Sequence, residues 1–414
     1  MELKKYKLGE IATIVNGATP STSDNENYDG EIVWFTPKDL SDQNVKYISK
    51  GYRNISQKGY DSCSTQIIPP YNILMSSRAP IGLLAINTIE CCTNQGFKNL
   101  VVNKSICDVD YLYYFLKFNI WQIDALGSGT TFKEVSKASL ERYELNIPCL
   151  ETQKSIAAIL SSLDHKIALN RAINQNLEKM AKQLYDYWFV QFDFPNEEGK
   201  PYKSSGGEMV WNKELKRYIP IGWHCGNLFE IAVFTNGLAC QKFRPKDNEV
   251  SLPVIKIREM HDGISVDTEK VSLNIPDSVK VHNGDVLFSW SASLEVMLWA
   301  YGLGGLNQHI FKVTSANGFP KSFYYFQLLD YVDVFKKMAE ARKTTMGHIT
   351  QDHLQQSTIA IPDNKDIADR FEERISPIFE QTVKLQEEIS NLVKQRDELL
   401  PLLMNGQISP LNCD

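Results

Sequence analysis

The chain lacks the sequence features of an exported or membrane-spanning protein. No apolar run reaches the length needed to cross a bilayer. The opening MELKKYKLGEIATI has no apolar core followed by a small-residue cleavage site, so we expect no secretory signal. The eight cysteines show no Cys-x-x-Cys spacing, which favours reduced thiols over a disulfide framework or a zinc site. We therefore expect a cytoplasmic protein without a bound metal.

Catalytic motifs are also missing. Ile68-Pro69-Pro70-Tyr71 looks like the Pro-Pro-aromatic part of an adenine methyltransferase site, but Ile68 stands where that chemistry needs Asn or Asp to hydrogen-bond the target amine. The segment Gly127–Thr131 lacks the spacing and the Lys of a phosphate-binding loop. The seven histidines show no metal-binding spacing. The sequence predicts a binding protein that has no catalytic residues and no cofactor.

Charge neither supports nor excludes binding to nucleic acid. The net charge is −6, yet residues 1–148 carry 15 Lys and Arg against 16 Asp and Glu, and residues 227–362 carry 13 against 14. The acidic excess lies on residues 363–404, with 6 basic against 10 acidic side chains. Each near-neutral part could therefore present a basic face to DNA. The acidic segment is compatible with a basic partner surface or with an ordinary solvated face.

The sequence contains a diverged tandem repeat. Matching blocks occur in the same order in both halves, with offsets that drift between 211 and 220 residues as loop insertions would cause. Such an ordered series indicates two copies of one fold. The matched blocks are Leu8 with Leu228, Glu10–Ala12 with Glu230–Ala232, Asn16-Gly17 with Asn236-Gly237, Lys38-Asp39 with Arg258-Glu259, Ser76 with Ser289, Asn94-Gln95 with Asn307-Gln308, Tyr113–Phe115 with Tyr324–Phe326, Thr130-Thr131 with Thr344-Thr345, and Ile147-Pro148 with Ile361-Pro362.

Each copy predicts a compact α+β domain. Short β-rich runs bounded by Gly, Pro, Asn and Ser precede an aromatic-rich helix, at about 109–126 in the first copy and 322–341 in the second. An apolar strand ending in Ile-Pro closes each copy, and a long helix follows. The expected division is domain one at 1–148, a long helix at 149–190, a structured linker at 191–226, domain two at 227–362, a second long helix at 363–404 and a tail at 405–414.

The two long helices carry apolar residues at seven-residue spacing. Such spacing calls for a partner helix, and each half supplies one, although two helices packed on their own domains are an alternative. Asn170 fills a position at which a buried polar side chain can fix the register at some cost in stability. The expected pairing residues are Ile156, Leu163, Asn170, Leu177 and Leu184 in the first helix, and Phe371, Ile378, Leu385, Leu392 and Leu399 in the second.

A second apolar row accompanies the first in each helix. In the first helix we expect Ile159, Ile173 and Met180 in this row, with Leu160 and Ile167 widening the stripe. In the second helix the row contains Ile375 and Ile389, and it is interrupted by Thr382 and Arg396.

The segment between the halves carries the most specific family signal. Residues 193–223 read DFPNEEGKPYKSSGGEMVWNKELKRYIPIGW, which closely resembles the central region of the specificity subunits of type I restriction-modification systems. The resemblance covers the whole chain through the Leu-x-Glu-Ile-Ala opening, the Gly-Thr-Thr loop, the Ile-Pro boundary and the helix after it. The second copy departs at its loop, where Lys343–Met346 lacks a Gly equivalent to Gly129.

This resemblance implies a non-catalytic subunit that recognises double-stranded DNA. Two target-recognition domains, held apart by an antiparallel coiled coil of pseudo-twofold symmetry, would each read one half of a split asymmetric site. The helices would dock two adenine methyltransferase subunits, and motor-nuclease subunits would join that core. A helix from about residue 154 to 189 spans roughly 50 Å at 1.5 Å per residue, so its length would set the gap between half-sites.

Loop residues are the candidates for DNA contact. Base readout needs polar or basic side chains at groove edges, and phosphate contacts need cations or exposed amides. Lys38 and Arg258 occupy equivalent positions, where DNA contact competes with a surface ion pair to the next residue. Trp290 fits the domain core better than a contact with DNA. The candidate contacts are Lys38, Ser77, Arg78, Thr130, Thr131, Lys133, Lys256, Arg258, Trp290, Arg342, Lys343 and Thr344. An adaptor whose domains have lost DNA binding is the competing function, and a DNA affinity with steep salt dependence would exclude it.

Overall fold

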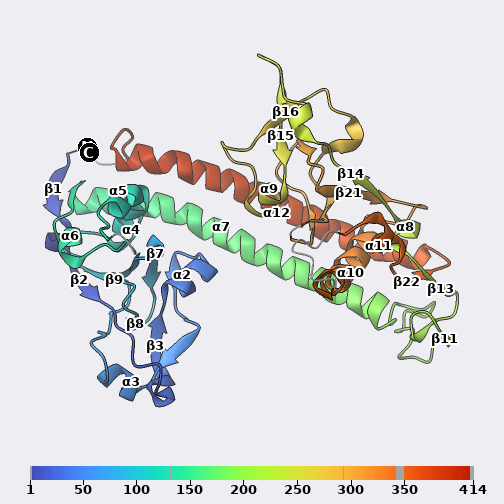
Figure 1. Cartoon of the computed structure of the whole chain (residues 1–414), viewed down its shortest axis with the longest axis horizontal. Helices are drawn as coiled ribbons and strands as arrows, with labels where there is room; N and C mark the ends of the chain where they lie inside the picture. Colours follow the sequence, from blue (N-terminus) through green and yellow to red (C-terminus); the bar gives the residue numbers. More distant parts are fainter. Residues whose placement is uncertain (1, 130–132, 292, 342–348, 411–414) are drawn as a thin grey trace. The chain divides into compact units, whose positions relative to one another are not determined.

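The structure is a computed structural model that describes residues 2–129, 133–291, 293–341 and 349–410 (Figure 1). It consists of two compact units. Unit 1 comprises the chain up to His165 together with the part from Val393 onward, and unit 2 comprises Lys166–Leu392. Two long helices, α7 (Leu150–Tyr185) and α12 (Asp366–Met404), contribute to both units.

Unit 1 contains a mixed α+β domain. Its sheets have the strand orders β2-β9-β6-β7-β4, β5-β3-β8 and β1-β10. The strands are β1 (Lys4–Lys7), β2 (Ala12–Asn16), β3 (Tyr28–Phe35), β4 (Tyr47–Ile48), β5 (Arg53–Ile55), β6 (Ile73–Ser77), β7 (Ile81–Asn87), β8 (Cys92–Thr93), β9 (Lys98–Val102) and β10 (Glu144–Ile147). The helices are α1 (Leu8–Ile11), η1 (Asn25–Asn27), α2 (Pro37–Gln43), α3 (Gln57–Asp61), α4 (Val109–Phe118), α5 (Ile120–Ala125) and α6 (Lys137–Glu141).

Unit 2 repeats this arrangement. Its sheets have the orders β14-β21-β18-β19, β16-β15-β20-β17 and β13-β22, and a separate hairpin pairs β11 with β12. The strands are β11 (Met209–Asn212), β12 (Arg217–Pro220), β13 (Trp223–Gly226), β14 (Ala232–Asn236), β15 (Ser251–Ile255), β16 (Lys270–Ser272), β17 (Lys280–Val281), β18 (Val286–Ser289), β19 (Glu295–Leu298), β20 (Gly304–Leu306), β21 (Ile310–Ser315) and β22 (Ile359–Pro362). The helices are η2 (Asp186–Val190), α8 (Leu228–Ile231), η3 (Cys240–Lys242), α9 (Ile257–Asp262), η4 (Asp277–Val279), α10 (Lys321–Ala341) and α11 (Gln351–Gln355).

The repeated residues have the same structural role in both domains. Glu10 accepts a hydrogen bond from the N–H of Lys7 over 2.8 Å, and Glu230 accepts one from Asn227 over 2.9 Å, so each carboxylate caps the first helix of its domain. The buried Ser76 hydroxyl accepts the N–H of Leu83 over 2.8 Å and holds the turn between β6 and β7. The sequence repeat is therefore confirmed as a repeat of structure.

Two details of the domains differ from the sequence-based expectation. The helix predicted at about 109–126 is broken into α4 and α5 at Asn119, whose side chain donates back to the carbonyl of Phe115 over 2.9 Å. Strand β13 lies within the segment predicted as linker, and it pairs with β22 as β1 pairs with β10. The described part of the second domain therefore starts before residue 227.

Helices α7 and α12 pair in antiparallel fashion. In unit 2, Asn170 donates to Glu388 over 2.9 Å and Asn174 donates to the Thr382 carbonyl over 3.3 Å. In the same unit the ring of Tyr185 lies 6.1 Å from that of Phe371. In unit 1, the first turns of α7 and the last turns of α12 share one core, which contains Ile156, Leu160, Leu399, Leu403 and Met404.

The second apolar row of α7 differs only in part from the prediction: Leu160 and Ile167, expected to widen the stripe, are buried, and Ile159 packs partly buried against the core of unit 1. The buried row consists of residues four after the main row, not three. Ile173 and Met180, expected in the seam, are 37% and 58% exposed. The apolar pattern pointed to Ile173 and Met180 because the buried residues next to them, Asn174 and Ala181, are polar or only weakly hydrophobic. The observed second row of α7 is Leu160, Ile167, Asn174 and Ala181, and Trp188 of η2 continues it.

Candidate nucleic-acid interface

Lys38 and Arg258 lie in the first turns of the equivalent helices α2 and α9, with both side chains exposed. The acidic residue after each is buried and caps the helix instead of lying on the surface. Asp39 accepts the N–H of Thr36 over 2.7 Å, and Glu259 accepts the N–H of Lys256 over 3.2 Å. Arg258 also donates to Glu259 over 2.7 Å, yet its side chain is 56% exposed. Both cations can therefore reach a ligand while their acidic neighbours hold the turn.

A basic cluster that was not among the predicted contacts lies near Arg258, since Arg244 and Arg258 both act on Glu269. The loop after β14 carries the exposed cations Lys242, Arg244 and Lys246. The hydrogen bond that Lys256 donates over 2.6 Å lowers the pKa of Glu269, and the nearby charges of Arg244 and Arg258 lower it further. The run Lys-Phe-Arg-Pro-Lys at 242–246 is the sequence feature that could have predicted this basic cluster. The corresponding loop of the first domain, residues 20–27, contains no Lys or Arg.

Ser77 and Arg78, two neighbouring residues predicted to contact DNA, have side chains in different environments. The Ser77 side chain is fully buried and its hydroxyl donates to the Gly96 carbonyl over 3.2 Å, so it is not exposed to a ligand in this structure. Arg78 is half-exposed, with its guanidinium 3.7 Å from Glu134. Burial would raise the pKa of Glu134, but the hydrogen bond from Lys98 and the charge of Arg78 lower it overall. Arg78 thus belongs to a charged group at the end of β6.

The remaining candidates fall into different environments. Lys133 is 45% exposed and pairs with Asp124 over 2.5 Å. Trp290 is half-buried against the core of the second domain, and its indole N–H donates to Asn236 over 3.2 Å. The other predicted contacts lie outside the described residues: Thr130, Thr131, Arg342, Lys343 and Thr344.

The paired helices present one apolar surface to solvent. On the part of α7 that belongs to unit 2, Leu169, Ile173 and Met180 are 52%, 37% and 58% exposed. These side chains recur at four- and seven-residue steps, so they lie on one side of the helix. We call Leu169, Ile173 and Met180 the outer face of α7. Leu169, Ile173 and Met180 therefore lie outside the apolar seam that the buried residues of α7 form.

Among the described residues, no group of three or more His, Cys, Asp or Glu side chains is placed to hold a metal ion. None of the helices in the described part of the chain is long and apolar enough to span a membrane.

Comparison with known proteins identifies the family. The model of the type I restriction modification DNA specificity domain matches residues 1–179 and 220–395, once for each copy of the repeat. A type I restriction enzyme MjaIX specificity subunit from Methanocaldococcus jannaschii is 30% identical over 98% of this chain and 93% of its own length. The HindI specificity subunit from Haemophilus influenzae is 25% identical over 74% of this chain and 79% of its own length.

The fold also matches a solved structure. The S subunit of a type I restriction-modification system from M. genitalium superposes with a TM-score of 0.61 at 14% identity, covering 97% of this chain and 96% of that one. Both the α+β class and the long helix after each domain are thus confirmed. The chain belongs to the specificity subunits of type I restriction-modification systems, which supply DNA recognition rather than catalysis.

Proposed function

We propose that this specificity subunit reads a split, asymmetric site in double-stranded DNA, with one half-site for each recognition domain. The observation that best supports this proposal is that the two domains share buried scaffold residues but differ in their exposed loops. Lys242, Arg244 and Lys246 of the second domain face solvent where the first domain has an uncharged or acidic loop. Because base readout depends on exposed loop side chains, two different loops on one scaffold favour two different half-sites.

We assign the positioning contacts to exposed cations. Lys38 and Arg258 would hold equivalent phosphates in the two half-sites, because they occupy equivalent exposed turns. Arg78, Lys133 and Lys256 would exchange their present carboxylate partners for phosphate oxygens. Surface ion pairs contribute little, so this exchange has a small cost. The basic loop at 242–246 adds contacts in the second half-site.

The outer face of α7 would dock one adenine methyltransferase subunit. An apolar helix face offers an amphipathic partner a surface to bury, since the opposite face of α7 is already paired with α12. A second methyltransferase subunit would contact the exposed side of α12. Motor-nuclease subunits would join this methyltransferase core.

The test is a methylome. The chain is co-expressed with the methyltransferase subunit of its own system in a host without other adenine methylation, and modified adenines are mapped by long-read sequencing. A single motif with two unlike halves and a fixed gap supports the proposal. Absence of methylation in the presence of a purified, folded complex would contradict it. Ile173→Asp, on the outer face of α7, should weaken co-purification of the methyltransferase, while Arg171→Asp tests whether charge alone has that effect.

A further inference from the structure

A continuous chain of polar groups joins the first recognition domain to both long helices within unit 1. Asp164 of α7 accepts a hydrogen bond from Arg396 of α12 over 2.9 Å, and each side chain is only 17% exposed. The second carboxylate oxygen of Asp164 accepts the hydroxyl of Tyr114, on α4, over 2.6 Å. One carboxylate therefore connects three helices.

The same chain continues into the domain through Lys46. Its ammonium lies 3.1 Å from the Tyr114 hydroxyl, donates to Ser161 of α7 over 2.8 Å and pairs with Asp110 over 2.7 Å. The Lys46 side chain is 7% exposed, and its charge lies 4.2 Å from the centre of the Tyr114 ring. We call Lys46, Asp110, Tyr114, Asp164 and Arg396 the polar joint.

In the described part of unit 2 the residues at the equivalent place differ, and an ion pair between a long helix and the domain lies elsewhere: Lys182 of α7 pairs with Asp330 of α10 over 2.9 Å, with side chains 33% and 36% exposed. Aligning the buried rows Ile156 and Leu160 with Phe371 and Ile375 gives an offset of 215 in the long helices. By that offset Asp164 corresponds to Phe379 and Arg396 to Ala181. Phe379 packs edge-on against Tyr325, the counterpart of Tyr114, with the ring centres 5.1 Å apart. At the positions of Asp164 and Tyr114, aromatic packing thus takes the place of the hydrogen bond in unit 2.

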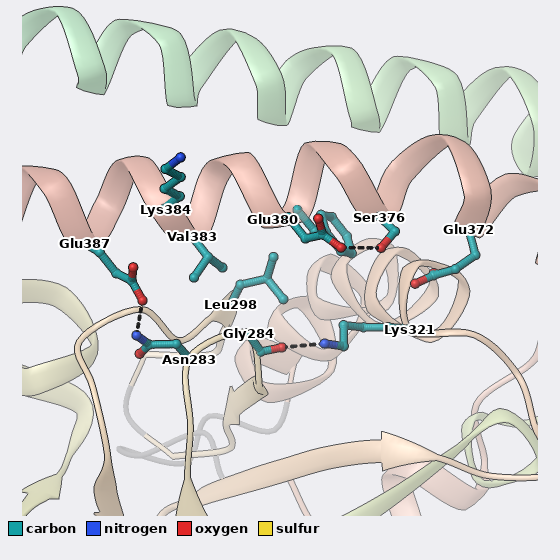
Figure 2. A pocket seen from close by; sticks show the side chains of 11 residues that line it. Asn283, Gly284, Leu298, Lys321, Glu372, Ser376, Glu380, Val383, Lys384 and Glu387 are labelled. Atoms are coloured by element: carbon teal, nitrogen blue, oxygen red, sulfur yellow. Dashed lines mark hydrogen bonds between the residues drawn. The ribbon is translucent and has the colours of Figure 1, made fainter.

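Unit 2 has a hollow beside Phe379, the counterpart of Asp164. This hollow of about 510 Å³ lies between the second domain and α12, lined by Phe379, by Ser376, the counterpart of Ser161, and by Lys321, the counterpart of Asp110. Figure 2 shows Lys321 directed to the Gly284 carbonyl and Ser376 to Glu380, so neither closes the hollow. The two joints therefore differ in both chemistry and packing.

Stability alone does not account for the polar joint. Desolvating a buried ion pair is costly, and well-packed apolar residues often serve as well or better. Unit 2 shows that this fold accepts the apolar solution at the same position. A charge-assisted hydrogen bond differs from apolar packing in being directional, so it holds one geometry more narrowly.

We propose that Asp164, Arg396 and Lys46 are positioning residues that fix the angle of the first recognition domain on the helix pair, and thereby the gap between the two half-sites. The inference rests on the proposed function, since a gap exists only if the two domains read one split site. Loss of the joint leaves the base-reading loops of the first domain unchanged. It allows that domain to engage its half-site at neighbouring gap lengths.

The test is the methylome of full-length variants in the methyltransferase complex. Arg396→Met removes the ion pair, and the double variant Asp164→Phe with Arg396→Ala introduces the residues that unit 2 carries at the same positions. We expect both to retain both half-sites while methylation at gaps one base pair shorter or longer rises about tenfold, the change that about 1.4 kcal/mol produces. Arg396→Lys keeps a cation at this position, so most methylation should remain at the single native gap length. Ser376→Ala and Lys394→Met, at the unit 2 joint and on exposed α12, are the matched controls.

The outcomes separate the two proposals. Retention of one fixed gap in folded, active Arg396→Met and in the double variant would overturn the positioning role and leave the proposed function intact. An equal broadening with Ser376→Ala would also overturn it, because the effect would not depend on the polar joint. Absence of a split motif in the unmodified chain would instead overturn the proposed function. Thermal unfolding of each complex distinguishes a broadened gap from loss of the folded domain.

Discussion

Gly17 and Gly237 occupy the same place in the two recognition domains, each pressed against the backbone of the turn that follows a neighbouring strand, β8 or β20. A Cβ atom on Gly17 would lie 2.0 Å from the Asn94 carbonyl oxygen, and one on Gly237 would lie 2.2 Å from that of Asn307. Asn94 and Asn307 are themselves a repeated pair, and their side chains accept the N–H groups of Gly96 and His309. The repeated Asn-Gly blocks therefore serve the fold in both copies.

Gly17→Ala and Gly237→Ala should each destabilise the domain that carries the substitution. Backbone atoms at this distance cannot rotate away, so the two segments must move apart, at a cost of about 1–3 kcal/mol or more. Urea unfolding followed by fluorescence measures the loss. Gly9→Ala is the control, since its nearest neighbour, Glu141, lies at 3.2 Å. Equal midpoints for all three variants would contradict the close approach.

Two isoleucines of α7 test which apolar row is buried. Ile167 is 3% exposed in the seam with α12, whereas Ile173 is 37% exposed on the outer face of α7. Ile167→Ala should lower the free energy of unfolding by about 2–5 kcal/mol, because it leaves a cavity. Ile173→Ala in the isolated chain should change it by less than about 0.5 kcal/mol. The reverse order would place Ile173 in the seam, as its spacing of three residues from the main row predicted.

The sequence predicted the scaffold better than the contacts between the helices. Leu8, Glu10 and their repeats identified the domain openings because buried and capping residues leave a fixed spacing. The seam was harder to predict, because Asn174 and Ala181 look unlike seam residues, whereas Ile173 and Met180 resemble them. Arg396 interrupts the second apolar row expected in α12, and its partner Asp164 lies 232 positions away along the chain. Pairs so distant along the chain leave no local periodicity.

His224 should make the second domain depend on pH. Burial would lower its pKa, but Asp363 at 2.5 Å and Glu230 at 3.4 Å raise it above the ordinary value of 6.5. A raised pKa in the folded state means that the contribution is complete below about pH 6.5 and is lost as the pH rises through the folded value. The difference in melting temperature between the native chain and His224→Gln should therefore be larger at pH 6 than at pH 9. A constant difference would contradict the pairing.

Lys38→Ala and Arg258→Ala should weaken DNA binding by the complex without changing which bases are read. Each removes one proposed phosphate contact, so the slope of log affinity against log salt should become shallower by about 1. Titrations with a duplex carrying the mapped motif, at several salt concentrations, measure the slope. Lys394→Ala, on the exposed side of α12, supplies the control. An unchanged slope in both variants would remove these residues from the interface.

The helices should act as a ruler for the gap. Inserting seven residues after Gln175 in α7 and seven after Ser390 in α12 preserves the heptad rows and lengthens each helix by about 10 Å at 1.5 Å per residue. At 3.4 Å per base pair, the gap should grow by about three base pairs. Methylome mapping should find both half-sites unchanged. A gap of the original length in an active complex would exclude the helices as the ruler.

The central claim, one half-site for each domain, is tested most directly by the methylome of a chimera. Residues 1–148 are replaced by the corresponding domain of a relative whose own motif is mapped in the same host, and the chimera is expressed with the methyltransferase subunit. We predict a motif in which one half now matches the donor, while the other half and the gap stay as in the native chain. Alteration of both halves, or of neither, in a folded and active complex would contradict the account.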